Sequence, residues 1–434
     1  MSDRAVTPAR QLQGAVRPPG DKSISHRAAM LAAIGDGSAK LANYSTGADC
    51  QSTLRCLEQL GVQVARGEEV LEIAGVGLRG LQAPGARLDA GNSGSTIRML
   101  SGILAAQPFA SEIGGDASLS RRPMARIKEP LTMMGANIKA ALGAMPPLQF
   151  AAAAGGLRAV EYQLPVASAQ VKSAILLAGL FASGTTRVLE PIATRDHTEL
   201  MLQHLGAPLE RHAGVIEIRG PVESLRALGE YVVPGDPSSA AFFLCAAAAL
   251  PGSDVIVEEV LLNPTRAALL DVLARLGAQP QVMAVEERAG ELVGTLQLRG
   301  PKTGLGGTNI AGAEAAALMD EVPILAVLAT QTTAGIRFDD VAELRVKESD
   351  RIETVAANLR AMGARCEAGP SSLEVPGKQR LRGARVVTRG DHRIAMAFAV
   401  AGLWAEGETV IDDSECAAVS YPEFFADLDR LASR

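Results

Sequence analysis

The chain has 434 residues, which is more than the roughly 250–300 residues at which a single hydrophobic core stops growing, so we expect at least two domains. Hydrophobic residues make up 47% and charged residues 21%, typical of a globular protein with a large core, whereas aromatic residues make up only 3%. We therefore expect elements that pack closely through small side chains. The net charge of −6 argues against a nucleic-acid-binding protein, which usually has a basic face.

The five cysteines are odd in number, scattered, and form no C-x-x-C pair, so the sequence indicates neither a disulfide framework nor a zinc site. We expect reduced, mostly buried thiols and no bound metal. Residues 1–16 contain no apolar segment typical of a secretory signal, and no uncharged apolar run reaches the roughly 18 residues of a membrane span. These features favour a cytoplasmic protein that is not membrane-bound.

The first predicted helix follows a Pro19-Gly20 turn and is capped by an acidic or hydroxyl residue such as Asp21. Its first turns carry Lys22 and Arg27, together with several hydroxyls. Because a helix N-terminus offers free N–H groups and the positive end of a dipole, these cations indicate an anion site. The alternative is an ordinary capped helix with solvated charges.

A second helix start, residues 90–99, contains glycines that let backbone N–H groups approach a ligand, and hydroxyls that add donors. A plain turn and cap is the alternative. Farther on, Pro123 is predicted at the first position of another helix, which would aim Arg122 at the helix start. A guanidinium there suits bidentate contact with a phosphate or carboxylate, although arginine pairs usually belong to a solvated face.

A third helix start, residues 167–172, is followed by a polar segment, residues 194–199. Ser168, Gln170 and Arg195 are residue types that suit a phosphate. His197 is interpreted as a capping or surface histidine.

Three further polar clusters precede helices in the second half of the chain. Asp320 and Glu321 stand directly before a strongly apolar helix, where they would favour the helix dipole, or where one would act as a base in an anion-rich cleft. Residues 345–351 alternate in charge, which is usually a sign of a solvated, salt-bridged helix. Residues 390–393 add the guanidinium of Arg393.

The chain repeats its helix starts. Residues 19–23, Pro-Gly-Asp-Lys-Ser, return as residues 234–238, Pro-Gly-Asp-Pro-Ser, an offset of 234 − 19 = 215 that indicates two related halves. A finer spacing of about 70–80 residues separates helix starts at Ser23, Ser93, Ser168, Ser238, Asp320 and His392. A second series of helices ends at Gly61, Gly135, Gly206, Gly277 and Gly363. With strand-like segments at 70–74, 214–219 and 296–299, this spacing predicts six βαβαββ units.

Two familiar motifs are absent. Residues 75–80 match G-x-G-x-x-G, but Pro84 and Gly85 follow where a dinucleotide-binding site needs a helix. Residues 20–23 lack the upstream glycine spacing of a P-loop.

Together these segments resemble the EPSP synthase family, the 3-phosphoshikimate 1-carboxyvinyltransferases. The resemblance runs from Gly14 to Phe425 and is carried by residues 19–28, 91–98, 122–124, 347–351 and 391–393. It implies an α/β, two-domain enolpyruvyltransferase-like fold, with six βαβαββ units in two inside-out α/β barrels joined by two crossover strands. One domain would contain residues 1–18 and 233–434 and the other residues 19–232, with the active site in the cleft between them.

The resemblance also implies an activity: transfer of the carboxyvinyl group of phosphoenolpyruvate to the 5-hydroxyl of shikimate 3-phosphate, without a cofactor or metal. The implied catalytic residues are Lys22, Asp320 and Glu348. Residues implied to bind shikimate 3-phosphate are Lys22, Ser23, Arg27, Ser168, Ala169, Gln170, Arg195, Asp320 and Lys347. Residues implied to bind phosphoenolpyruvate are Lys22, Gly94, Arg122, Gln170, Arg351 and Arg393. We expect a monomer whose partners are these two small molecules.

The sequence departs from many relatives at two positions. Val419 stands where they have a phosphate-contacting lysine, and Ala169 stands where some have a second serine; with Arg195, the latter resembles the branch that uses arginine there. Gly94 occupies a position where alanine hinders glyphosate in some members, so we expect glyphosate to bind. The alternatives are an enolpyruvyltransferase acting on UDP-N-acetylglucosamine, whose usual reactive cysteine is missing from residues 107–125, and a non-catalytic anion-binding protein.

Overall fold

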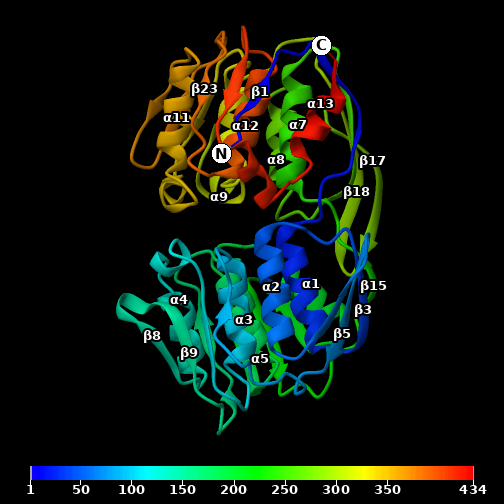
Figure 1. Ribbon diagram of the computed structural model, residues 1–434, viewed down its shortest axis with the longest axis vertical. Coiled ribbons are helices and arrows are strands. Elements are labelled where there is room, and N and C mark those ends of the chain that lie inside the picture. Colours follow the sequence, from blue (N-terminus) through cyan, green and yellow to red (C-terminus); the bar gives the residue numbers. More distant parts are fainter. Residues whose placement is uncertain (1, 434) are drawn as a thin grey trace. The chain divides into compact units, whose positions relative to one another are not determined.

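The computed structural model describes residues 2–433, which form two compact units (Figure 1). Unit 1 contains residues 2–19, 234–286 and 292–433, and unit 2 contains residues 20–233 and 287–291. The chain thus passes from unit 1 to unit 2 and back twice. Residues 287–291 belong to unit 2 because Glu291 contacts His197 there, and Gly290 lies against Leu200.

Unit 2 contains three sheets with one shared strand order. In each sheet a central strand pairs in parallel with the strand on one side and antiparallel with the strand on the other, which pairs antiparallel with a fourth. The strands are β3 (Asp36–Ala42), β4 (Gln63–Arg66), β5 (Val70–Val76), β6 (Leu88–Asp89), β7 (Ser111–Gly114), β8 (Ile138–Ala141), β9 (Met145–Phe150), β10 (Leu157–Arg158), β11 (Glu161–Gln163), β12 (Ala182–Leu189), β13 (Leu209–His212), β14 (Val215–Gly220) and β15 (Gly229–Val232). The helices are α1 (Lys22–Ile34), α2 (Ala48–Gln59), α3 (Gly94–Leu104), α4 (Ala125–Met133), α5 (Ala169–Gly179) and α6 (His197–His204).

In the part of the chain that the structure describes, unit 1 also has three sheets; two of them follow this strand order, and the third has three strands. The strands of unit 1 are β1 (Arg4–Val6), β2 (Gln11–Val16), β16 (Asp254–Leu261), β17 (Gln281–Arg288), β18 (Glu291–Arg299), β19 (Thr308–Ile310), β20 (Ile336–Phe338), β21 (Glu367–Ala368), β22 (Leu373–Val375), β23 (Arg385–Val386), β24 (Thr409–Ile411) and β25 (Ala432–Ser433). Its helices are α7 (Pro237–Ala249), α8 (Ala268–Arg275), α9 (Gly312–Ala317), α10 (Val322–Ala329), α11 (Arg351–Ala361), α12 (His392–Gly402) and α13 (Phe424–Leu431). The six βαβαββ units predicted from the repeat spacing are therefore present.

The chain passes from one unit to the other shortly after β2 and again directly after β15. Strand β2 immediately precedes α1 of unit 2 but pairs with β16 in unit 1, whereas β15 precedes α7 of unit 1 but pairs with β3 in unit 2. In each unit, the last strand before the chain leaves for the other unit thus becomes part of a sheet of the unit that it leaves.

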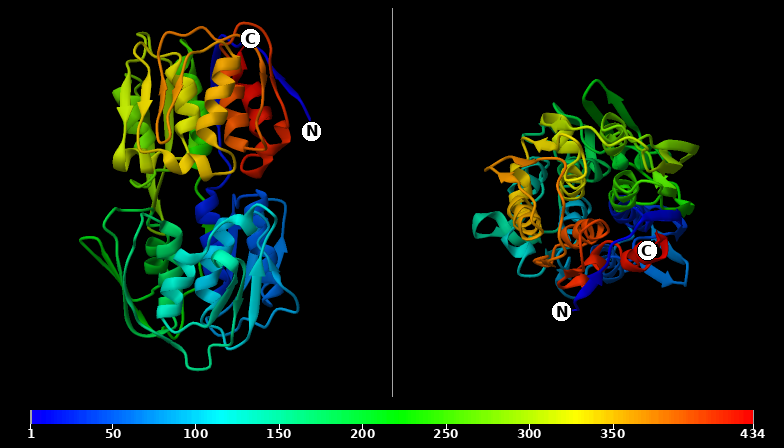
Figure 2. Two further views of the ribbon diagram at one scale, coloured as in Figure 1. Left: turned by 90° about the vertical axis from the view of Figure 1, so that its left-hand side faces the viewer. Right: turned by 90° about the horizontal axis from the view of Figure 1, so that it is seen from above.

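The most buried helices form the centre of each unit, and the sheets surround them. These helices are α1, α3 and α5 in unit 2 and α7, α10 and α12 in unit 1, and the view from above in Figure 2 shows strands outside the helices. Their approach depends on small side chains, as the composition predicted: a Cβ on Gly102 of α3 would lie 2.2 Å from the carbonyl oxygen of Ala174 in α5. In the part of the chain that the structure describes, no helix is long and apolar enough to span a bilayer.

The predicted helix ends are confirmed. Gly61, Gly135, Gly206, Gly277 and Gly363 all have positive φ, between 85° and 101°, as expected of glycines that end helices. The prediction for Pro123 was wrong, because α4 begins two residues later at Ala125 with Met124 as its N-cap. A short 3₁₀ helix, Leu119–Arg121, ends just before Arg122, whose extended backbone leads into α4 instead of starting it.

Candidate active-site clusters

In unit 2, the starts of α1, α3 and α5 carry the polar residues singled out in the sequence. Asp21, Ser93 and Ser168 are the N-caps, and each side chain accepts a hydrogen bond from a backbone N–H of its own helix. The residues expected to bind substrate at these helix starts therefore belong to regular, capped first turns. We call the group Lys22, Ser23, Arg27, Gly94, Arg122 and Gln170 the unit 2 cluster.

Arg27 is buried and held from three sides. Its Nε donates to Thr198 Oγ1 at 2.6 Å, and its Nη2 donates to Ser173 Oγ at 2.9 Å. Its Nη1 donates to the carbonyl of Ser23 at 2.9 Å, within the first turn of α1. Burial lowers the pKa of Arg27 to about 10, and the nearby charge of Arg195 adds to this lowering. Arg27 therefore remains a cation at neutral pH in a fixed orientation.

Lys22 lies at the first position of α1, with its Nζ 2.6 Å from Asp49 Oδ2 of α2. The side chains of both residues are partly accessible, at 28% and 13%. The ammonium is therefore oriented by a neighbouring carboxylate and still open to a ligand. Asp49 lies outside every motif recognised in the sequence and was not predicted.

The starts of α3 and α5 are joined through Gln170. Arg98 Nη1 donates to Gln170 Oε1 at 2.6 Å, and Gln170 Nε2 donates to Ser95 Oγ at 2.9 Å. A Cβ on Gly94 would lie 2.6 Å from Arg98 Nη1 and 3.6 Å from Arg122 Nη1, so the glycine lets two guanidinium groups approach the helix start. Arg122 Nη2 also donates to Asn92 Oδ1 at 2.7 Å. Arg98 lies within the motif of residues 91–98, but no role was predicted for it.

Arg195 directly follows Thr194, which is hydrogen-bonded to a network of buried ion pairs. Glu190 accepts hydrogen bonds from the backbone N–H of Thr194 at 2.9 Å and from its hydroxyl. Glu190 is in turn 2.9 Å from the Nζ of Lys172, whose side chain is 1% exposed and lies 2.7 Å from Glu199 as well. These contacts fix the backbone next to Arg195.

His197 is neither a cap nor a surface histidine. Asp196 is the N-cap of α6, and the ring of His197 is fully buried, with Nδ1 2.7 Å from Glu291 Oε1. The earlier interpretation was wrong because the partner carboxylate is 94 residues away in the sequence.

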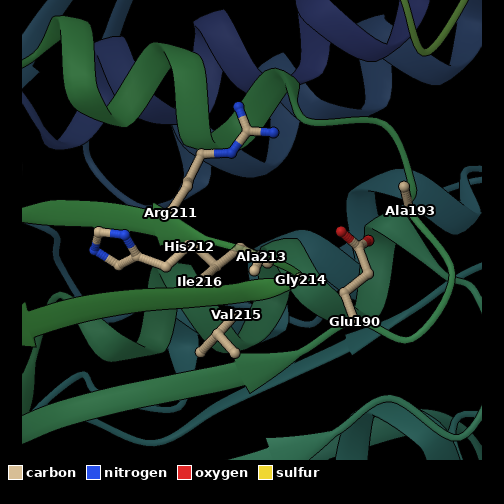
Figure 3. Close-up of a pocket in the computed structure, with 8 residues that line it drawn as sticks. All are labelled: Glu190, Ala193, Arg211, His212, Ala213, Gly214, Val215 and Ile216. Carbon is tan, nitrogen blue, oxygen red and sulfur yellow. The ribbon is translucent and has the colours of Figure 1, made fainter.

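A pocket of about 430 Å³ lies beside the same segment (Figure 3). In the close-up, the carboxylate of Glu190 points toward the loop that carries Ala193, and Arg211 points away from the strand. Arg211 Nη1 lies 2.9 Å from Asp196 Oδ2. The lining residues are Glu190, Ala193, Arg211, His212, Ala213, Gly214, Val215 and Ile216, and none of them is an expected substrate ligand.

In unit 1, a second cluster joins the starts of α10, α11 and α12. It consists of Asp320, Lys347, Glu348, Arg351 and Arg393, which we call the unit 1 cluster. Asp320 Oδ1 lies 3.5 Å from Arg351 Nη1 and 3.9 Å from Lys347 Nζ, and Asp320 Oδ2 lies 3.7 Å from Arg393 Nη2. One carboxylate thus faces three cations from the starts of α11 and α12.

Arg351 is the centre of the unit 1 cluster. Its side chain is 1% exposed; Nε donates to Asp391 Oδ2 at 2.9 Å and Nη2 donates to Glu348 Oε2 at 2.6 Å. Burial alone would lower the pKa of Arg351, but the charges of these carboxylates and of Asp320 raise it above its usual value. Burial alone would raise the pKa of Asp391, but Arg351 outweighs burial and lowers it.

The chain matches the family model described as EPSP synthase (3-phosphoshikimate 1-carboxyvinyltransferase) over residues 6–428. It belongs to the EPSP synthase family.

Members of the EPSP synthase family match this chain over its whole length or nearly so. The 3-phosphoshikimate 1-carboxyvinyltransferase of Koribacter versatilis is 53% identical, with both chains fully covered, and that of Solibacter usitatus is 50% identical, covering 99% of this chain and 100% of its own. The EPSP synthase structure from Acinetobacter baumannii matches with a TM-score of 0.90 at 38% identity, covering 99% of this chain and 98% of the other. The family fold, two inside-out α/β domains, is the one described above.

The contacts bring all the expected residues of unit 1 into one cluster, but they join only some of those in unit 2. Contacts join Arg27 to Ser23 and place Gly94 near Arg122, and all five members of the unit 1 cluster are linked through Asp320 and Arg351. In residues 2–433 there is no group of three or more His, Cys, Asp and Glu side chains that could hold a metal ion. All five cysteines are free and buried, as predicted.

Proposed function

We propose that the chain is a 3-phosphoshikimate 1-carboxyvinyltransferase, which transfers the carboxyvinyl group of phosphoenolpyruvate to the 5-hydroxyl of shikimate 3-phosphate and releases phosphate. The family membership over residues 6–428 supports this reaction. The structural observation that carries the proposal is the position of Asp320, whose carboxylate faces Lys347, Arg351 and Arg393 within 3.9 Å.

The two substrates are highly charged anions, so the proposed site must hold them with cations and still move protons. In unit 2, we propose that Lys22 contacts both substrates and that Ser23, Arg27, Ser168, Ala169, Gln170 and Arg195 hold shikimate 3-phosphate. Arg122 and Gln170 would bind the phosphate of phosphoenolpyruvate, with Gly94 leaving room for it. In unit 1, Arg351 and Arg393 would bind its carboxylate, and Lys347 would contact shikimate 3-phosphate.

The proposed chemistry is addition followed by elimination. A proton is added to the methylene carbon of phosphoenolpyruvate, the 5-hydroxyl oxygen attacks the adjacent carbon, and phosphate leaves the tetrahedral intermediate as a methyl proton is lost. We propose that Asp320 accepts the hydroxyl proton. Glu348, or alternatively Lys22, delivers the proton to carbon. Each such proton transfer typically contributes about 10²–10⁴-fold to the rate.

Release of inorganic phosphate from phosphoenolpyruvate tests the proposed reaction, with shikimate 3-phosphate or UDP-N-acetylglucosamine as acceptor. We expect release only with shikimate 3-phosphate. Release only with the nucleotide sugar would transfer the assignment to the related enolpyruvyltransferase.

A non-catalytic anion-binding protein is distinguished by neutralising the carboxylates. We expect Asp320→Asn and Glu348→Gln to reduce turnover by about 10²-fold or more while both substrates still bind. A pure binder would bind its anions more tightly after either change, because each carboxylate repels them.

Three further properties belong to the same proposal. Gly94 lacks the side chain that would obstruct the position next to Arg122, so we propose that glyphosate competes with phosphoenolpyruvate; an inhibition constant far above the KM for phosphoenolpyruvate would contradict this. We also propose a monomer, to be tested by sedimentation. The free, buried cysteines support a location in the cytoplasm.

A further inference from the structure

The adjacent carboxylates Asp320 and Glu321 lie in different surroundings. Asp320 is partly accessible and faces the cations of α11 and α12, whereas Glu321 is 6% exposed and lies against the start of α7. The Oγ of Ser238, in the first turn of α7, donates a hydrogen bond to Glu321 Oε1. The proposed reaction assigns no task to this buried carboxylate.

The start of α7 is the structural repeat of the start of α1. Asp21 caps α1 by accepting from the N–H of Ile24 at 2.8 Å, and Asp236 caps α7 by accepting from the N–H of Ser238 at 2.7 Å. At α1 the next residue is Lys22, whose ammonium is 28% exposed. At α7 the equivalent residue is Pro237, so this helix start offers no such accessible cation.

The cation at α7 comes instead from Arg266. Its side chain is 4% exposed, and Nη2 donates to Ser238 Oγ at 2.9 Å and lies 3.3 Å from Asp236 Oδ1. A helix start that also holds a buried guanidinium favours an anion. The carboxylate of Glu321 accepts from Ser238 Oγ, which itself accepts from this guanidinium, so a side chain of the protein takes the place that the repeated start at α1 leaves for a ligand.

We infer that Glu321 is a positioning residue: its carboxylate fills the anion site at the start of α7 and thereby fixes the backbone that carries Asp320. This inference rests on the proposed function, in which Asp320 accepts the proton of the acceptor hydroxyl. Glu321 is the N-cap of α10 and precedes Val322-Pro323, so little backbone freedom separates the anchored carboxylate from its neighbour. Displacement of a reacting group by about 1 Å can cost on the order of 10²-fold in rate.

Glu321→Ala removes the carboxylate and leaves a space that acetate can fill. We expect kcat to fall on the order of 10- to 100-fold, with the KM for phosphoenolpyruvate nearly unchanged, and added acetate to restore part of kcat with saturation. Glu321→Gln keeps an acceptor for Ser238, so it should recover most of kcat. The control is Glu314→Ala in the same unit, where Glu314 is paired with Arg275 at 2.8 Å; its kcat should not respond to acetate.

Acetate should also raise the melting temperature of Glu321→Ala, but not that of Glu314→Ala, because a ligand that binds the native state stabilises it. This readout does not depend on turnover, so it separates a failure of the inference from a failure of the proposed reaction, which would show as an inactive wild-type protein. The inference would be overturned if Glu321→Ala kept the wild-type kcat. It would also be overturned if kcat were neither restored by acetate in Glu321→Ala nor retained in Glu321→Gln. If Glu321→Ala does not fold, Ser238→Ala decides: a lowered kcat supports the inference, and an unchanged kcat overturns it.

Discussion

Arg351 shows how a single side chain organises the unit 1 cluster. Its guanidinium bridges Asp391 and Glu348 and also reaches Asp320, which a compact ammonium group cannot do from one position. Because it is almost fully buried, these contacts are shielded from water and strongly oriented.

We predict that Arg351→Lys lowers kcat/KM for phosphoenolpyruvate by on the order of 10²-fold or more, although the charge is kept. The lysine cannot satisfy both carboxylates, and a buried carboxylate left without its partner is costly. Steady-state kinetics measures the effect. Arg360→Lys on the same helix is the matched control, because Arg360 donates only weakly, at 3.2 Å, to the carbonyl of Cys366. Equal kinetics in the two variants would contradict the assigned role of Arg351.

At Gly94 we predict that an added methyl group raises the KM for phosphoenolpyruvate. In Gly94→Ala the new Cβ would lie 2.6 Å from Arg98 Nη1, so this guanidinium must move away from Gln170 and disturb the start of α5. Gly85→Ala is a suitable control, because no atom lies within 4 Å of the corresponding Cβ. An unchanged KM in Gly94→Ala would show that the hydrogen bond between Arg98 and Gln170 is not needed for binding phosphoenolpyruvate.

Residues within short motifs were predictable, whereas their partners were not. Lys22, Arg27 and Arg351 stand out because each is close in sequence to a helix start. Asp49 and Thr198, which orient Lys22 and Arg27, are 27 and 171 residues away from them and carry no local signal. Contacts of this kind depend on the folded chain.

At the scale of elements, the repeat predicted the starts of one series of helices and the ends of a second series. N-caps such as Ser93 and Ser168, and the glycines that end the second series of helices, act through hydrogen bonds and φ angles within a few residues. The pairing of β2 with β16 and of β15 with β3 has no such signal, because strand pairing joins distant segments.

We predict that Gly102→Ala destabilises unit 2 by about 1–3 kcal/mol, the usual cost of overpacking. Its Cβ would lie 2.2 Å from the carbonyl oxygen of Ala174, so α3 and α5 would have to separate. The midpoint of urea unfolding should fall accordingly. In Gly85→Ala, where space is open, the midpoint should not fall; a similar loss in both variants would refute the close-packing explanation.

At the scale of the whole molecule, buried neutral histidines should make the protein sensitive to acid. Burial lowers the pKa of both His26 and His392 to about 3, from an ordinary value of 6.5. As the pH falls below 6.5, the unfolded chain binds protons that the native state does not. Stability should therefore decrease by about 1.4 kcal/mol per pH unit for each histidine.

Urea unfolding at pH 7.5 and pH 5.5 measures this dependence. His26→Asn keeps a group that can bond to Thr53, which lies 2.7 Å from His26 Nδ1, and should reduce the pH dependence by about one proton. His212→Asn is the control, because His212 is 69% exposed. An identical pH dependence in the wild type and His26→Asn would contradict the buried neutral state.

Proton NMR of the wild-type protein in D₂O tests the identity of the reaction most directly. With phosphoenolpyruvate and shikimate 3-phosphate, we predict that the vinyl signals of an enol ether appear on the acceptor. Part of the methylene group should carry deuterium, because the carbon is a methyl group in the intermediate. Unchanged phosphoenolpyruvate with this acceptor, or an enol ether formed only on UDP-N-acetylglucosamine, would contradict the account.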